Sequence, residues 1–239
     1  LGYDIRTNTD PLKMADYFEA IFGRKVLVDT TRDAIQDSDH IPGRIHQIIA
    51  QFGFDDIITT NYDTLIERAF REQLIEPQVV VRDQELVNAR RLPRVIKMNG
   101  CIFLHPNEIV LTGNDFLSYA ELHPVVQVFV TKSFVESTVL FLGFGLNDPA
   151  FRAINERVLS MLGRNSRLAF SLQYGVSRAE KEFWKNRQVQ IIDLCSGEQD
   201  ISDNEEKLYR VLRAFSAVQR EHAQNWMIKV RLPLFAEVS

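Results

Sequence analysis

Short apolar runs alternate with amphipathic stretches along the chain. The apolar runs predict buried strands at 57–60, 79–81, 95–98, 138–142, 167–171 and 189–194, with a short edge strand at 109–111. Stretches with apolar residues on one face predict helices at 11–22, 26–35, 42–52, 114–120, 125–135, 149–162, 177–186 and 205–219, and from 64 onward. Strands that alternate with helices are typical of an α/β fold with a doubly wound, mainly parallel sheet flanked by helices.

The stretch 57–67 is a predicted strand that stops at polar residues and is followed at once by a predicted helix. Thr64 and Glu67 have the spacing of a capping box at the start of that helix. Asn61 and Asp63 therefore lie where a strand ends and a helix begins, which is the edge at which open α/β sheets bind ligands. The alternative is that Asp63 or Thr64 only caps the helix, and the spacing leaves both interpretations open.

Two further strand ends carry polar or glycine residues. One is the segment 97–100, and the other is 143–148, which reads Gly-Phe-Gly-Leu-Asn-Asp. Its two glycines would let backbone amides approach a phosphate or a ribose closely, with a helix N-terminus just beyond. Each strand end also has a structural alternative, because Asp148 suits a helix N-cap, Gly100 a turn and Lys97 a solvated strand end.

Composition excludes several classes of function. The chain has 239 residues with a formal net charge of −4, and no basic patch stands out, so we expect no direct nucleic-acid partner. Cys101 and Cys195 cannot form a four-cysteine zinc site, so we expect no metal and a reducing, cytoplasmic environment. No apolar run approaches the ~18 residues of a membrane-spanning helix, so we expect no membrane association.

Four segments come in a distinctive order and spacing. They are Thr59-Thr60-Asn61-Tyr62-Asp63, Lys97-x-Asn99-Gly100, the run Ile-Val-Leu-Thr-Gly-Asn-Asp-Phe at 109–116, and the run Leu-Phe-Leu-Gly-Phe-Gly-Leu-x-Asp at 140–148. Together they resemble the sirtuin-like domains, and within that family the bacterial branch that hydrolyses NAD in anti-phage defence. The resemblance runs from about Asp10 to Leu194, and the first and last segments are fairly specific as a pair.

The resemblance implies a Rossmann-like sheet that binds NAD as a substrate and holds no metal. In the family, the residue at the position of Asn61 orients the ribose and the attacking water, Asp63 lies near the nicotinamide, and the loop 143–145 faces the adenosine. Cleavage of the nicotinamide–ribose bond passes through an oxocarbenium-like state, so the site must hold the ribose, stabilise positive charge and admit one water. The catalytic residues implied are Asn61, Asp63 and Asn99. The cofactor-binding residues implied are Thr60, Asn61, Asp63, Lys97, Gly143, Phe144, Gly145 and Asp148.

Asn99 departs from the family pattern. The family has a Lys-x-His-Gly motif whose His is the general base, and this chain has an amide at that position. An amide does not take up a proton usefully, so base catalysis there is lost. Two explanations stay open: a naturally weak or inactive protein, or an inactivating substitution. His46 and His105 do not occupy the motif position, and we expect structural roles for both.

Two other family features have no counterpart here. The Gly-Ala-Gly-x-Ser loop that cradles the pyrophosphate is absent before Asp10, so we expect the first strand and this loop to lie upstream of Leu1. The small zinc module is absent too, which disfavours a deacylase. We expect residues 1–239 to form a single sirtuin-like domain with a helical extension at 196–239.

Two functions from different classes follow. The first is an NAD hydrolase of anti-phage defence, controlled by a partner protein or by homo-oligomerisation, and Asn61 with Asp63 favours it. The second is a non-catalytic module that binds NAD or ADP-ribose and controls assembly or a partner effector, and Asn99 favours it. Nicotinamide release by the chain and by its Asn99→His variant distinguishes the two.

Overall fold

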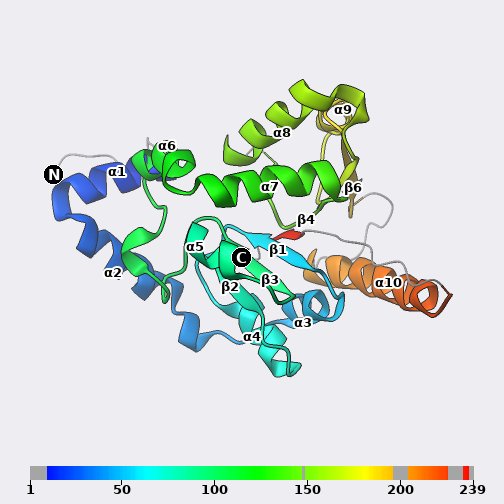
Figure 1. Ribbon diagram of the computed structural model, residues 1–239, viewed down its shortest axis with the longest axis horizontal. Coiled ribbons are helices and arrows are strands. Elements are labelled where there is room, and N and C mark those ends of the chain that lie inside the picture. The colour runs from blue at the N-terminus through cyan, green and yellow to red at the C-terminus, as the bar shows by residue number, and fades with distance from the viewer. Residues whose placement is uncertain (1–9, 147–148, 196–203, 226–233, 237–239) are drawn as a thin grey trace.

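One parallel sheet organises the part of the chain that the structure describes (Figure 1). The computed structural model describes residues 10–146, 149–195, 204–225 and 234–236. The sheet has seven strands in the order β2-β3-β1-β7-β4-β5-β6, and each neighbouring pair is parallel. Their bounds are β1 Asp56–Thr59, β2 Gln78–Val80, β3 Arg94–Lys97, β4 Leu140–Leu142, β5 Ala169–Gln173, β6 Val189–Asp193 and β7 Leu234–Ala236.

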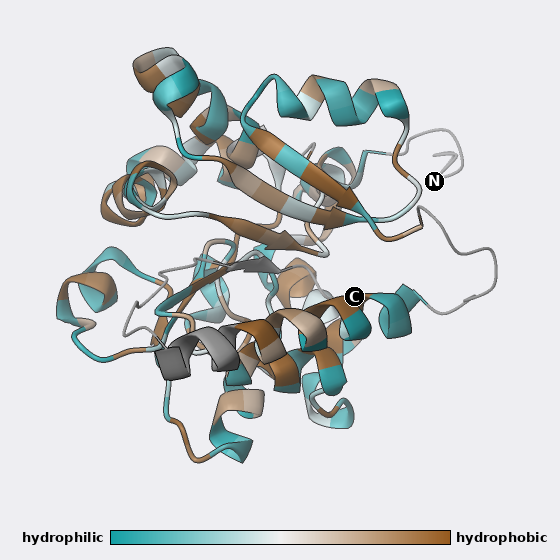
Figure 2. Ribbon diagram, turned by 90° about the vertical axis from the view of Figure 1, so that its right-hand side faces the viewer, coloured by the Kyte–Doolittle hydropathy of each residue, from teal (hydrophilic) through white to brown (hydrophobic). Residues whose placement is uncertain are grey.

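Helices cover both faces of this sheet. They are α1 Pro11–Phe22, α2 Arg24–Ile35, α3 Arg44–Gln51, α4 Leu65–Glu72, α5 Asp83–Asn88, α6 Gly113–Leu122, α7 Pro124–Glu136, α8 Pro149–Leu162, α9 Arg178–Lys185 and α10 Asn204–Asn225. Ile58, Ile96 and Phe141 pack with α5, α7, α8 and α9 on one face. Their chain neighbours Ile57, Val95 and Leu140 pack with α3, α4 and α10 on the other. Successive strand residues point to opposite faces, so apolar runs fill two cores, and Figure 2 shows largely brown strands between helices that mix brown and teal.

A smaller group of helices lies away from the two main cores. Val28 of α2 is buried with Ile102 and Ile109, and Tyr62 packs against them. Helix α1 contributes no buried residue, and it contacts α2 and α6. Figure 1 shows α1, α2 and α6 together at one end of the molecule.

The doubly wound α/β prediction is confirmed, with three corrections in the predicted elements. Residues 109–111 form no strand, although Ile109 and Val110 are buried as their apolar pattern indicates. Their backbone bonds go to the Asn99 carbonyl and to the side chains of Arg24, Tyr62 and Asp115 instead of a neighbouring strand. Helix α5 was not predicted, because six residues with one buried position, Leu86, leave almost no periodic signal.

The C-terminal region also differs from its prediction. Helix α10 falls inside the expected helical extension at 196–239, but Leu234–Ala236 form a strand between β1 and β4. This segment therefore lies in the middle of the sheet. Three residues carry too little pattern to predict a central strand.

The strand order places a topological switch point at the carboxyl ends of the central strands. The chain runs from β1 to β2 and β3 on one side, then crosses to β4, β5 and β6 on the other. Thr59 pairs with Lys97 on one side and with Ala236 on the other, and Ala236 pairs with Leu142. The segments that follow β1, β3 and β4 therefore emerge at the same level of one edge, where open α/β sheets bind ligands.

Candidate functional site

The loops after β1 and β3 are bonded to each other. The Met98 N–H donates to the carbonyl of Thr59 (2.9 Å), and the Ile102 N–H donates to the carbonyl of Tyr62 (3.2 Å). The Asn61 N–H in turn donates to the hydroxyl oxygen of Thr59 (3.1 Å). The structure thus brings the segment of Asn61 and Asp63 beside that of Asn99, as the shared edge of parallel strands predicts.

Asp63 caps the helix that follows it. Its Oδ1 accepts from the N–H of Leu65 at 3.0 Å. Thr64 instead bonds to the buried Asp37, through its backbone N–H (2.6 Å) and its hydroxyl (2.7 Å). The capping box predicted from Thr64 and Glu67 is therefore wrong, because the N-cap residue Thr64 makes no side-chain bond to the helix, whereas Asp63 satisfies the N–H group of the first helical residue. A capping carboxylate has further acceptor sites, so this role does not prevent contact with a ligand.

Lys97 is enclosed in the protein. Its ammonium lies 3.0 Å from Oε1 of Glu67, and the two side chains are 1% and 2% exposed. Lys97 also donates to the carbonyl of Asp63, so it ties the end of β3 to the loop after β1 and to α4. The predicted contact between Lys97 and a cofactor gains no support, because the ammonium is already engaged and shielded. The sequence did not predict Glu67 as the partner of Lys97, since the spacing between Thr64 and Glu67 indicates a helix cap instead.

Asn99 lies beside a cavity. It is half-buried and lines a space of about 560 Å³, within the ~300–1,000 Å³ usual for small-molecule sites. The other walls come mainly from α1, α6 and α8, and they are largely apolar. Its polar residues besides Asn99 include Asp10, Lys13, Asp16 and Gln127. No sequence signal indicated that α1 would form part of this wall.

The glycine segment after β4 lies at the same edge, but not against Asn61. Because β7 separates β1 from β4, their axes are two strand spacings apart, ~10 Å. Gly143 is exposed with a φ of 60°, a conformation that favours glycine. Gly145 is also exposed, and a Cβ there would meet no atom of the described residues within 4 Å. The fold itself therefore gives no steric reason for glycine at 145, whereas a closely approaching ligand would.

Phe144 and Asp148 complete the predicted set. The Phe144 side chain is 3% exposed and stacks on Phe141 with ring centroids 5.6 Å apart, so only its backbone could reach a ligand. Its carbonyl accepts from the side chain of Gln173 (2.9 Å). Thr60 is half-buried next to Asn61. Asp148 lies outside the described residues.

A second cavity, of about 680 Å³, lies between α2, α5 and α6. Arg82 pairs there with Glu108 and Arg24 with Asp115, while the carboxylate of Asp83 accepts from the N–H groups of Val125 and Val126. Tyr119 lines both cavities, and burial raises the pKa of its hydroxyl, so the group stays protonated. The cavity beside Asn99 is the better candidate site, because it adjoins the switch point.

His46 makes the folded protein sensitive to acid. Its ring is buried, Nδ1 accepts from the N–H of Gly43 (3.1 Å), and Nε2 has no partner among the described residues. Burial lowers the pKa of His46 below 6.5, although the charge of Asp63 opposes the shift. Below about pH 6.5 the unfolded state then binds more protons than the folded state, so stability falls as pH falls.

We expect His46→Gln to reduce this loss of stability. Gln keeps an acceptor for Gly43 and does not titrate. The free energy of unfolding, measured with urea, should fall less between about pH 7.5 and about pH 5.5 for the variant than for the unaltered protein. Equal falls would assign the acid sensitivity to other groups.

The fold and this edge define a class, the doubly wound, Rossmann-like α/β domains with a candidate ligand site at the switch point. The sequence model described as SIR2-like domain matches residues 55–192, more than half of the chain, and the chain belongs to this family. Within the described residues, no helix is long and apolar enough to cross a membrane. The same residues hold no cluster of three or more His, Cys, Asp and Glu side chains suited to a metal.

Curated relatives carry related names. The chain is 28% identical over 169 residues to "NAD(+) hydrolase ThsA" of Cytobacillus dafuensis, and the aligned region covers 70% of this chain and 34% of the relative. It is 28% identical over 181 residues to the protein of the same name in Bacillus cereus (strain MSX-D12), and this aligned region covers 72% of the chain and 37% of the relative. It is 25% identical over 213 residues to "Defense-associated sirtuin 2" of Bacillus subtilis, and this aligned region covers 87% of the chain and 20% of the relative. The chain thus spans about a third or less of the length of these relatives.

Proposed function

We propose that this domain hydrolyses NAD at the bond between nicotinamide and ribose. The observation that carries the proposal is that the segment of Asn61 and Asp63 is bonded to the segment of Asn99 at the switch point. Asn99, but neither Asn61 nor Asp63, lines the cavity. The chain belongs to the SIR2-like family, and relatives named NAD(+) hydrolase support the substrate. The direct test is to incubate the full-length protein with NAD and to measure nicotinamide and ADP-ribose.

The chemistry gives each residue a task. Water attacks the anomeric carbon of the ribose, the bond to nicotinamide breaks, and ADP-ribose and one proton are released. In this proposal Asn61 holds the ribose and the water, and the carboxylate of Asp63 stabilises positive charge on the sugar. Asn99 cannot take the proton of the water, so the form with Asn99 has low activity.

The biological setting is part of the same proposal. A relative named defence-associated sirtuin supports a role in anti-phage defence, where loss of NAD would stop a cell from supporting infection. NAD is abundant in the cytoplasm, which is therefore the proposed location. Hydrolysis of a central cofactor must be held off in healthy cells, so we propose control by a partner protein or by homo-oligomerisation.

Asn99 itself supports a second candidate function. A domain that keeps the nucleotide-binding edge but lacks a general base could bind NAD or ADP-ribose and control assembly. This alternative predicts binding of NAD without release of nicotinamide. It also predicts that Asn99→His leaves turnover at background.

Gly145 provides a test of nucleotide binding that does not depend on catalysis. A Cβ at this position meets no described atom within 4 Å, so Gly145→Val should leave the melting temperature nearly unchanged. The added side chain would occupy the space into which a nucleotide fits closely. We expect binding of ADP-ribose, measured by titration calorimetry, to weaken about tenfold or more, equivalent to ~1.4 kcal/mol. Unchanged affinity would remove the segment after β4 from the proposed site.

A further inference from the structure

One residue, Val110, joins the two loops of the candidate edge. The Val110 N–H donates to the carbonyl of Asn99 (2.9 Å), and the Tyr62 hydroxyl donates to the carbonyl of Val110 (2.6 Å). Tyr62 lies between Asn61 and Asp63 in the chain. Val110 therefore bridges the two loops, in addition to the backbone bonds that join them directly.

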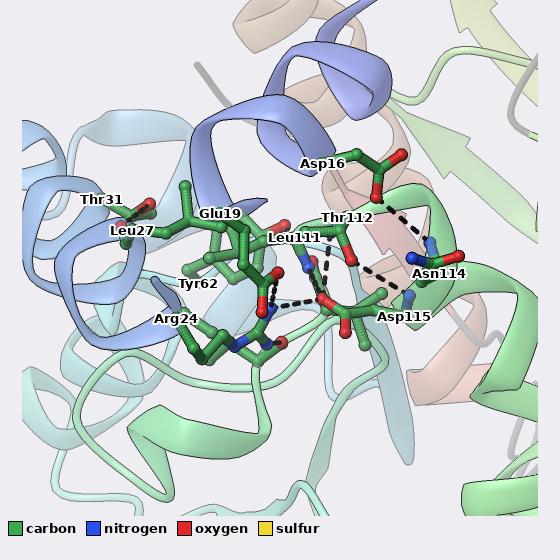
Figure 3. Close-up of polar contacts among 12 residues, drawn as sticks. Asp16, Glu19, Arg24, Leu27, Thr31, Tyr62, Leu111, Thr112, Asn114 and Asp115 are labelled. Atoms are coloured by element: carbon green, nitrogen blue, oxygen red, sulfur yellow. Dashed lines mark hydrogen bonds and ion pairs between the residues drawn. The ribbon is translucent and has the colours of Figure 1, made fainter. Parts of the chain in front are cut away.

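The segment around Val110 is held by Asp115 and Arg24. One carboxylate oxygen of Asp115 accepts from the N–H groups of Leu111 (2.8 Å) and Thr112 (3.0 Å). The same oxygen accepts from Nη1 of Arg24 at 2.7 Å (Figure 3). The second terminal nitrogen of Arg24 donates to the carbonyl of Ile109. These charge-assisted bonds fasten the segment on both sides of its central residue.

Close packing transmits the position of this segment to Asn99. Gly100 has a φ of 90°, and a Cβ there would lie 3.0 Å from the Cα of Ile109. The backbone of Ile109 thus lies directly against the turn that carries Asn99. Because Ile109 and Gly100 are already closely packed, a displacement of Ile109 changes the space available to the turn.

We infer that Arg24 and Asp115 are positioning residues for the reaction proposed above, on which this inference rests. Through Val110 they hold the turn of Asn99 in register with the loop of Asn61. Arg24 belongs to α2, which lies outside the family match at 55–192. The 109–116 segment, which resembles the family in sequence, thereby gains a role that needs no contact with the substrate.

The test uses the full-length protein carrying Asn99→His, so that turnover can be measured. Two variants weaken the network. Arg24→Met removes the bonds to Asp115 and to the Ile109 carbonyl, together with the ion pair between Arg24 and Glu19. Tyr62→Phe removes the bond to the Val110 carbonyl. Arg187→Met is the matched control. Arg187 pairs with Glu156 at 3.0 Å, and its side chain is 30% exposed, against 26% for Arg24.

Hydrogen exchange and kinetics are read separately. Peptides covering 98–112 should exchange faster in both test variants, because the segment of Val110 is held less firmly and the bonds from Val110 N–H to Asn99 and from Ile102 N–H to Tyr62 open more often. The kcat for nicotinamide release should fall about 10- to 100-fold with little change in KM, since misplacement affects the transition state most. The control should leave both quantities unchanged at a temperature where every variant is folded.

Each other outcome counts against the inference. Faster local exchange with unchanged kcat would reject the positioning role, and unchanged exchange would reject the network itself. A fall in kcat that the control shares would assign the effect to general stability. If the parent with Asn99→His releases no nicotinamide, the proposed function fails, and the positioning role in that reaction fails with it. The exchange data still report whether the network exists.

Discussion

The Asn99→His variant should release nicotinamide from NAD roughly 10²–10⁴-fold faster than the unaltered protein, the usual contribution of a positioned general base. Residue 99 is half-buried beside the 560 Å³ cavity, and its carbonyl is held by the N–H of Val110, so a ring at this position would start from a fixed backbone. An imidazole with an ordinary pKa of ~6.5 accepts a proton near neutral pH, which an amide does not. The rate of the variant should therefore rise with pH through that range.

Two further variants make this result specific. Asn99→Gln keeps an amide and adds a methylene, so it should show no gain. Asn61→Ala added to Asn99→His should abolish the gain, because the ribose and the water lose the group proposed to position them. Equal rates for the unaltered protein and Asn99→His, measured with full-length protein, would reject the catalytic assignment and favour the binding module.

Lys97→Met should lower the free energy of unfolding by about 3–5 kcal/mol, the typical cost of removing one partner of a buried ion pair. The variant leaves Glu67, 2% exposed, without its ion-pair partner, and Oε2 of Glu67 already lacks a hydrogen-bond partner among the described residues. It also removes the donor to the carbonyl of Asp63. Chemical denaturation followed by far-UV circular dichroism measures the loss.

The double variant Lys97→Met with Glu67→Leu distinguishes the ion pair from simple packing. Replacing both charges with apolar side chains removes the unpaired carboxylate, so most of the lost stability should return. Lys132→Met is the exposed control, because Lys132 and Glu136 are 59% and 57% exposed and such pairs contribute ~0–1 kcal/mol. A loss for Lys97→Met no larger than that of the control would contradict the buried pair.

The sequence alone was enough to predict the α/β architecture and the common edge of the candidate site. Runs such as 57–60 and 95–98 are apolar on both faces, which is the local consequence of a parallel strand between two helix layers. Once such strands are parallel, their carboxyl ends meet at one edge. Asn61, Asp63 and Asn99 could therefore be grouped before their contacts were known.

Only the tertiary structure decided what each polar side chain contacts. Lys97 and Glu67 are 30 residues apart and meet inside the protein, so Lys97 became an internal tie. The Phe144 side chain is buried in the core, because it packs in one cluster with residues of β4, α7 and α8. Sequence spacing reports which side of an element a residue occupies, but not which distant group faces it.

The longest-range features left no local pattern at all. Strand β7 lies between β1 and β4, although nearly a hundred residues separate it from β4 in the chain. Arg24 reaches Asp115 across 91 residues, and its sequence context shows only an amphipathic helix. Periodicity arises from the burial of one face, whereas these contacts depend on which segments the completed fold brings together. The pattern of this chain therefore determined its layers and the edge that carries the candidate site, and the tertiary structure determined the strand at the centre of the sheet and the contacts that hold that edge.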